Sequence, residues 1–226
     1  SILCKNYRMS TICRYQYWDY LIGISSIKRI QSMFQGTLVA QGAFSIYRTD
    51  ALREIGGWPE SVGEDIVMTW NLLKKGHKIG HADDAICYTN VPEDYKSFFK
   101  QRVRWSRGMI EAFRSVPELI LRKRKSTFFV INNLFFPLLD FVYLFVFVPG
   151  VLAAVFFQYY LLAGIMTLLQ IPMAVLFNFT VLKIQQRTLA KQDIKIPKDL
   201  WKSFFGYMLF YQVLMTPACI TGYYKE

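Results

Sequence analysis

The sequence predicts an α/β layer followed by an α-helical membrane region. Short strand-like and helix-like segments alternate through residues 1–117, which is the pattern of an α/β layer. Residues 126–226, by contrast, consist mainly of long apolar runs. The composition agrees, because 53% hydrophobic and 17% aromatic residues are high values for a soluble domain. A chain of 226 residues has room for one domain plus a membrane region.

The first part contains two segments that are typical of strands. Residues 37–48, TLVAQGAFSIYR, are rich in strand formers, and Gly42 interrupts them, so we expect a strand with a bend. Residues 78–89, KIGHADDAICYT, predict a strand and a turn, and His77 and His81, near this turn, are expected to be solvated.

Three helices are expected between and after these strands. Residues 49–57 predict a short helix that two glycines end. Residues 64–76 have acids in the first turn, lysines in the last and Gly76 at the end, which favours a more stable helix. Residues 95–116 predict a long amphipathic helix.

The second part, residues 118–226, is divided by length, because a spanning helix needs roughly 20 apolar residues. Asp140 lies inside the first apolar run, where a carboxylate either lines a polar channel or bonds a neighbouring helix. The uncharged stretch 156–160, FFQYY, is the expected reversal point. We therefore expect three transmembrane helices, at roughly residues 128–155, 160–182 and 205–223.

Basic residues fix the expected orientation. The block RKRK at 122–125 precedes the first span, and the basic segment 183–204 precedes the last. Positive segments stay on the cytoplasmic side of a membrane. We therefore expect a multi-pass protein of the cell inner or plasma membrane, with residues 1–117 in the cytoplasm.

The charge and the cysteines narrow the function classes. The net charge of +11 gathers around the apolar runs, which favours a lipid bilayer as partner over nucleic acid. The four cysteines form no CxxC pair and indicate reduced thiols. No metal site is expected in this chain, since the sequence HADD at 81–84 is best interpreted as a surface turn.

Three side chains share one face of the helix at 95–116. Gln101, Arg104 and Trp105 are spaced i, i+3 and i+4. A guanidinium holds phosphate oxygens with a rigid donor fork, and an indole packs on a sugar ring. The alternative is an interfacial helix that meets lipid headgroups.

Two adjacent carboxylates, Glu64 and Asp65, stand at a predicted helix start. One interpretation is a general base that takes a proton from a sugar hydroxyl. The alternative is that both only stabilise the helix N-terminus.

Taken together, these motifs resemble the processive family 2 membrane glycosyltransferases, which include cellulose, chitin, hyaluronan and poly-N-acetylglucosamine synthases. Their TED-like and QxxRW motifs stand here as Gly63-Glu64-Asp65, with Gly63 in place of a frequent Thr, and as residues 101–105, QRVRW. The flanking text, QGAFSIYRTDALREIGGWPES, looks most like that of bacterial poly-β-1,6-N-acetylglucosamine synthases. The detailed resemblance covers roughly residues 20–116.

The resemblance implies a role for each site residue. Asp65 would be the general base, supported by Glu64, and Arg104 would bind the donor diphosphate. The acceptor-binding residues that it implies are Gln101, Trp105, Gln41, Gly42 and Ala43.

The resemblance also implies an incomplete enzyme. Residues 1–117 would be the C-terminal half of a GT-A-type domain, without the uridine-binding and DxD motifs of the family. The intact enzyme would then use a UDP-sugar and Mg²⁺ or Mn²⁺, whose ligands lie in a missing N-terminal half, and this chain alone would be inactive. The reaction would be inverting transfer of a sugar, N-acetylglucosamine by local resemblance, to a growing β-linked polysaccharide. A small membrane subunit is a further expected partner.

Two alternatives remain open at this point. One is a lipid-directed glucosyltransferase, because some of these also carry QxxRW. The other is a non-catalytic membrane remnant or assembly subunit that lacks the donor site.

Overall fold

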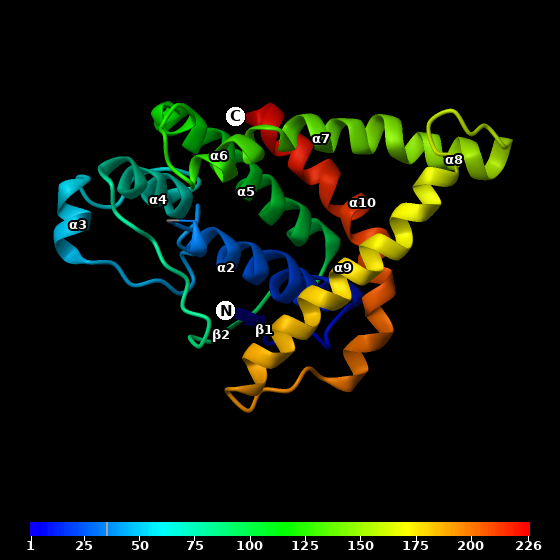
Figure 1. The fold of residues 1–226 in the computed structure, drawn as a ribbon, viewed down its shortest axis with the longest axis horizontal. Coiled ribbons are helices and arrows are strands. Elements are labelled where there is room, and N and C mark those ends of the chain that lie inside the picture. Colours follow the sequence, from blue (N-terminus) through cyan, green and yellow to red (C-terminus); the bar gives the residue numbers. More distant parts are fainter. Residues whose placement is uncertain (35) are drawn as a thin grey trace.

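The computed structural model describes residues 1–34 and 36–226. Its first part combines a small sheet with packed helices (Figure 1). The elements in chain order are β1 (Ile2–Cys4), α1 (Thr11–Trp18), the π-helical turn η1 (Asp19–Ile24), α2 (Ser25–Met33), α3 (Thr49–Glu54), α4 (Glu64–Lys75), β2 (Cys87–Thr89), α5 (Tyr95–Ser115) and the 3-10 turn η2 (Pro117–Ile120).

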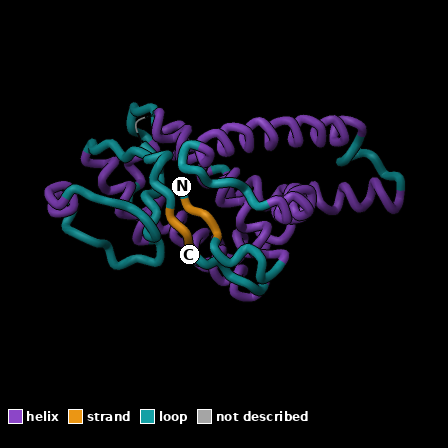
Figure 2. The backbone as a smooth tube through the Cα atoms, turned by 90° about the horizontal axis from the view of Figure 1, so that it is seen from below, coloured by secondary structure: helices purple, strands orange, loops and turns teal. Residues whose placement is uncertain are grey.

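The sheet consists, in the described residues, of β1 and β2, which pair in parallel with Ile2 opposite Cys87 (Figure 2). The predicted strand at 37–48 was wrong, because this segment is irregular. Its backbone bonds go to different elements: Thr37 N–H donates to Ile79 O, and Ala40 N–H donates to the hydroxyl of Thr69. A strand needs one partner strand along its length, and no such partner occurs among the described residues. The described part of the chain is therefore mostly helical.

The helices predicted around the site are confirmed, and local caps explain their ends. Helix α4 begins at Glu64 and ends before Gly76, whose φ of 101° is a left-handed conformation that suits glycine. Helix α5 begins after Asp94, whose carboxylate accepts a hydrogen bond from Ser97 N–H at 2.9 Å. Because these capping residues lie next to the helices that they end, the sequence alone predicts the helix ends.

The described residues form three hydrophobic clusters, of which the two larger ones join the elements around the site. The first core gathers β1, α1 and η1 around Trp18, which is fully buried. The second core joins α4 to α5, where the rings of Trp70 and Phe113 meet edge to face with centroids 4.8 Å apart. Edge-to-face contact is a favoured aromatic geometry. The second core therefore fixes the relation of the two helices that carry the predicted site.

The second part of the chain is helical. Its elements are α6 (Thr127–Leu134), α7 (Phe136–Val142), the π-helical turn η3 (Tyr143–Phe147), α8 (Val148–Phe157), α9 (Ile165–Ala190), the 3-10 turn η4 (Lys198–Leu200) and α10 (Trp201–Lys225). Figures 1 and 2 show the turn between α8 and α9 projecting away from the rest of the chain.

Two stretches of the described residues are long and apolar enough to cross a membrane, Thr127–Phe157 and Lys198–Lys225. They correspond to the first and third expected spans. The turn between the first two runs starts at Gln158, whose φ is 54°, within the expected reversal stretch 156–160. Helix α9 contains 26 residues, and the expected middle span within it stays a prediction.

Asp140, in α7, bonds to α10. Its carboxylate accepts hydrogen bonds from Tyr223 at 2.8 Å and from Gln212 at 3.2 Å, and the residue is 9% exposed. Of the two interpretations of Asp140, these contacts support the bond between helices. A buried carboxylate with such partners fixes the position of α7 against α10.

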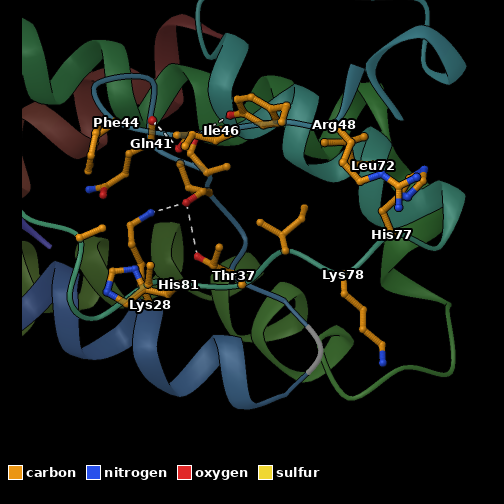
Figure 3. A pocket seen from close by; sticks show the side chains of 18 of the residues that line it. Lys28, Thr37, Gln41, Phe44, Ile46, Arg48, Leu72, His77, Lys78 and His81 are labelled. Carbon is orange, nitrogen blue, oxygen red and sulfur yellow. Dashed lines mark hydrogen bonds between the residues drawn. The ribbon is translucent and has the colours of Figure 1, made fainter. Parts of the chain in front are cut away.

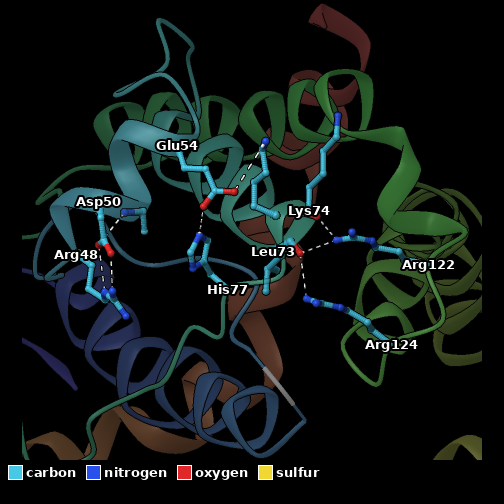
Figure 4. Close-up of polar contacts among 10 residues, drawn as sticks. Arg48, Asp50, Glu54, Leu73, Lys74, His77, Arg122 and Arg124 are labelled. Atoms are coloured by element: carbon cyan, nitrogen blue, oxygen red, sulfur yellow. Dashed lines mark hydrogen bonds and ion pairs between the residues drawn. The ribbon is translucent and has the colours of Figure 1, made fainter.

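The basic block at 122–125 has a structural task as well. Arg122 and Arg124 each donate from Nη1 to the carbonyl of Leu73, at 2.9 and 3.0 Å (Figure 4). Leu73 lies in the last turn of α4, where carbonyls lack helical partners and favour cations. The start of α6 is thereby tied to the helix that carries the carboxylates.

Candidate active site

The carboxylates Glu64 and Asp65 form the first turn of α4. The positive end of the helix dipole stabilises negative charge there. Gly63 precedes them and donates its N–H to Glu111 Oε2 of α5 at 3.1 Å. The start of α4 is therefore anchored through Gly63, which leaves the two carboxylates to other partners.

The segment 41–43, QGA, lies against these carboxylates. Gly42 N–H donates to Asp65 Oδ2 at 3.3 Å, and a Cβ on Gly42 would lie 3.6 Å from Glu64 Oε1. One turn later in α4, the Thr69 hydroxyl donates to Asp65 O at 2.6 Å and accepts from Ala40 N–H at 2.8 Å. The structure thus brings together two groups of residues that the sequence placed in one site.

Helices α4 and α5 cross where the backbones of two glycines are in contact. A Cβ on Gly63 would lie 2.4 Å from Cα of Gly108, closer than real Cβ contacts. Arg104 precedes Gly108 by four residues and Glu111 follows it by three, so all three share one face of α5. Since Gly108 touches Gly63 directly, Arg104 lies about one helical turn from the start of α4.

The QxxRW residues differ in exposure. Arg104 is exposed, whereas Gln101 is half-buried, and its side-chain oxygen has no hydrogen-bond partner within the described residues. Trp105 is 38% exposed, and its ring stacks on that of Tyr20 with centroids 6.3 Å apart. An exposed guanidinium and a partly exposed indole together suit a ligand with phosphate and sugar groups.

A pocket of about 360 Å³ lies between the segment that carries QGA and residues 77–82 (Figure 3). Lys28, from α2, points into it, and Gln41 also lines it. Lys28 is 7% exposed, and its amine donates to Val39 O. Burial lowers the pKa of Lys28 to about 8, although the negative charge of Asp65 opposes this shift. The described lining includes no carboxylate, so the pocket is basic.

The residues present do not fit a metal ion. Within the described residues, no group of three or more His, Cys, Asp or Glu side chains is arranged to hold one. Asp83, in the sequence HADD, pairs instead with Arg29 Nε at 2.9 Å. His81 is less solvated than expected, because its side chain is 10% exposed and burial lowers its pKa to about 4.

Several residues around the site were not predicted from the sequence. Arg102, inside QRVRW, is 3% exposed and pairs with Asp19 Oδ2 at 3.1 Å. A signal existed, since Arg102 shares the apolar face of α5 with Phe98 and Met109 at spacings of four and seven residues. Lys28 and Asp19 gave no comparable signal, because their partners are remote in sequence.

The start of α4 and the QxxRW helix thus lie in one chain with two helices that are long and apolar enough to cross a membrane. Comparison with known families identifies the class: the family described as "Glycosyl transferase family group 2" matches residues 6–181. The chain therefore belongs to this family.

Named relatives show which members of the family are similar to this chain. The chain is 31% identical over 102 residues to a poly-beta-1,6-N-acetyl-D-glucosamine synthase of Staphylococcus aureus (strain COL). It is 32% identical, over the same length, to the synthase of that name from Staphylococcus epidermidis (strain ATCC 35984). Each match covers 45% of this chain and 25% of the relative, so the chain matches about a quarter of the length of these relatives. No solved structure matches the chain.

Proposed function

We propose that the chain provides the acceptor side of an inverting membrane glycosyltransferase. The donor is a UDP-sugar, and the acceptor is the end of a growing β-linked polysaccharide. The observation that supports this most directly is the contact between Gly42 and Asp65 beside the Gly63–Gly108 crossing. It collects a carboxylate, a backbone loop and an arginine helix in one place.

The chemistry follows from the residues. An acceptor hydroxyl attacks the anomeric carbon of the donor sugar while its proton passes to the Asp65 carboxylate. The bond from the anomeric carbon to the phosphate oxygen breaks, and UDP leaves. Arg104 offers a planar fork of donors that stabilises the charge developing on the diphosphate. Glu64 supports Asp65 from the neighbouring position.

The acceptor sugar lies, in this proposal, between the QGA segment and the QxxRW helix. Gln41, Gly42 and Ala43 line one side, and Gln101 and Trp105 line the other. The exposed part of the Trp105 ring is available for apolar sugar faces.

The donor side belongs to other parts of the intact protein. Family members generally use a divalent metal with the UDP-sugar, and the carboxylates of this chain do not form such a site within the described residues. In this proposal, the nucleotide is held by a further part of the catalytic domain. N-acetylglucosamine is the proposed sugar, supported by the names of the staphylococcal relatives.

The test is incorporation of radiolabelled sugar by membranes that carry the full-length gene product. UDP-N-acetylglucosamine and UDP-glucose are supplied in parallel, beside membranes that carry residues 1–226 alone. Insoluble labelled polymer from the first donor, formed only by the full-length product, is the expected result. Product of one or two sugars in the lipid fraction would favour lipid-directed transfer. Absence of transfer from both donors, despite normal insertion, would contradict the proposal.

A further inference from the structure

A buried charge lies within the QRVRW segment. Arg102 is 3% exposed, although it lies between the exposed Arg104 and the half-buried Gln101. Its Nη2 lies 3.1 Å from Asp19 Oδ2 in an ion pair whose side chains are 4% and 13% exposed. A charge this deep in the protein is tolerated only when it is paired, so Arg102 and Asp19 hold each other in place.

Helix α10 also contacts this ion pair. The hydroxyl of Tyr211 donates to Asp19 Oδ2 at 2.8 Å, the same oxygen that faces Arg102. Nη1 of Arg102 lies 3.9 Å from the sulfur of Met215, one turn further along α10. The ion pair inside the site helix thus receives a hydrogen bond from an apolar helix that is long enough to cross a membrane.

The same residues surround Trp105. The guanidinium of Arg102 lies 4.2 Å from the centroid of the Trp105 ring, within the range of a cation–π contact. Tyr20, the chain neighbour of Asp19, stacks on that ring at an interplanar angle of 29°. The position of the indole therefore depends on both members of the buried pair.

We infer that Arg102, Asp19, Tyr20 and Tyr211 are positioning residues that hold Trp105 and couple α10 to the acceptor site. A displacement of α10 moves the Tyr211 hydroxyl away from Asp19 and weakens the contact between Asp19 and Arg102. The position of the Trp105 indole then changes. The structural part of this inference stands alone. Its consequence for acceptor binding rests on the proposed function.

The test is fluorine NMR of the full-length protein labelled with 5-fluorotryptophan in detergent micelles. The Trp105→Phe variant assigns the Trp105 resonance. Tyr211→Phe removes one hydroxyl and keeps the ring, so the protein should still fold. The matched control is Tyr223→Phe, which removes a hydrogen bond of the same 2.8 Å length from the same helix, but to Asp140. We expect Tyr211→Phe to move the Trp105 resonance by more than its line width, and Tyr223→Phe to leave it in place.

The initial rate of sugar transfer is the second measurement. With a β-linked N-acetylglucosamine oligosaccharide as acceptor, Tyr211→Phe should raise the acceptor KM about threefold to tenfold, the effect of one lost hydrogen bond. The donor KM should not change, which a general loss of folded protein would not produce.

The outcomes separate the two claims. A Trp105 resonance that stays in place in both Tyr211→Phe and Asp19→Asn overturns the positioning role. A resonance that moves while the acceptor KM stays constant overturns the link to the acceptor. A resonance that moves in a protein that transfers no sugar supports the positioning role and contradicts the proposed function.

Discussion

Asp65 differs from Glu64 in how its carboxylate is held. Its Oδ1 accepts from the N–H of Ile66 at 2.8 Å, and its Oδ2 accepts from the N–H of Gly42 at 3.3 Å. The first bond fixes the carboxylate at the start of α4, and the second directs one oxygen towards the QGA segment. A general base must be held within hydrogen-bond reach of its proton source. For this reason the proposal gives Asp65 the proton transfer and Glu64 the supporting role.

Arg104→Lys tests whether the donor fork matters beyond the charge. A lysine keeps the positive charge but offers a point donor in place of the planar fork. We expect kcat to fall by about 100-fold, the scale of losing one charge-stabilising group. Lys100→Arg, one turn earlier on α5, is the control for changes of basic side chains on this helix. Equal rates in Arg104→Lys and the wild type would show that charge alone suffices.

Lys28 links stability to pH. Burial lowers the pKa of Lys28 from its ordinary value of 10.5 to about 8, so the folded state releases this proton at a lower pH than the unfolded chain does. The cost of burying the charge is present below pH 8 and disappears as the pH rises towards 10.5. We expect the Tm of the protein in detergent to rise over this window relative to Lys28→Met, which lacks the group.

The exposed Lys78→Met is the matched control, because it removes a lysine of the same pocket that is not buried. The Tm of Lys78→Met should rise with pH as the Tm of the wild type does. A Lys28→Met variant with the same pH profile as Lys78→Met would contradict the assignment.

At the scale of elements, the crossing of α4 and α5 sets the geometry of the site. Gly63 and Gly108 let the two backbones meet, while Trp70 and Phe113 pack the same helix pair further along. Any side chain at the crossing would separate Asp65 from the QxxRW helix. Small residues are therefore required there for close approach of the backbones.

Gly63→Ala tests this crossing. The new Cβ would lie 2.4 Å from the backbone of Gly108, which cannot yield like a flexible side chain. We expect a loss of about 1–3 kcal/mol in the free energy of unfolding, together with loss of transfer. The control is Gly80→Ala, whose Cβ would meet only the Ser32 hydroxyl at 3.9 Å. Unchanged stability in Gly63→Ala would mean that the helices are not this close.

The elements also show what a sequence can predict. Helices α4 and α5 were predictable because caps, charges and periodicity lie within each segment. The strand expected at 37–48 was not formed, because a strand depends on partners elsewhere in the chain, and this segment bonds to Ile79 and Thr69 instead. The cluster around Arg102 was hidden for the same reason, since Asp19 and Tyr211 come from distant segments.

At the scale of the molecule, the site lies beside the apolar helices. Arg122 ties the start of α6 to α4, Asp140 joins α7 to α10, and Tyr211 joins α10 to η1. The candidate catalytic residues are thus connected to both apolar runs. This arrangement supports the proposed transfer of a sugar at a membrane.

The proposed orientation predicts a labelling pattern. We expect Lys123→Cys and Lys195→Cys to be protected from a membrane-impermeant maleimide in intact cells, because basic segments stay in the cytoplasm. Tyr159→Cys, in the turn after α8, should react. All three should react in opened membranes, which controls for accessibility. Labelling of Lys195→Cys in intact cells would contradict the expected path of α9.

The most direct test of the account is the rate of sugar transfer by full-length protein carrying Asp65→Asn, at equal expression and insertion. Asparagine keeps the shape of the side chain but takes up no proton, so the rate should fall by about 100- to 10,000-fold. Glu64→Gln should retain more activity, and the exposed Asp84→Asn should match the wild type. Transfer by Asp65→Asn at the wild-type rate would contradict the assignment of the general base, and with it the site proposed at the start of α4.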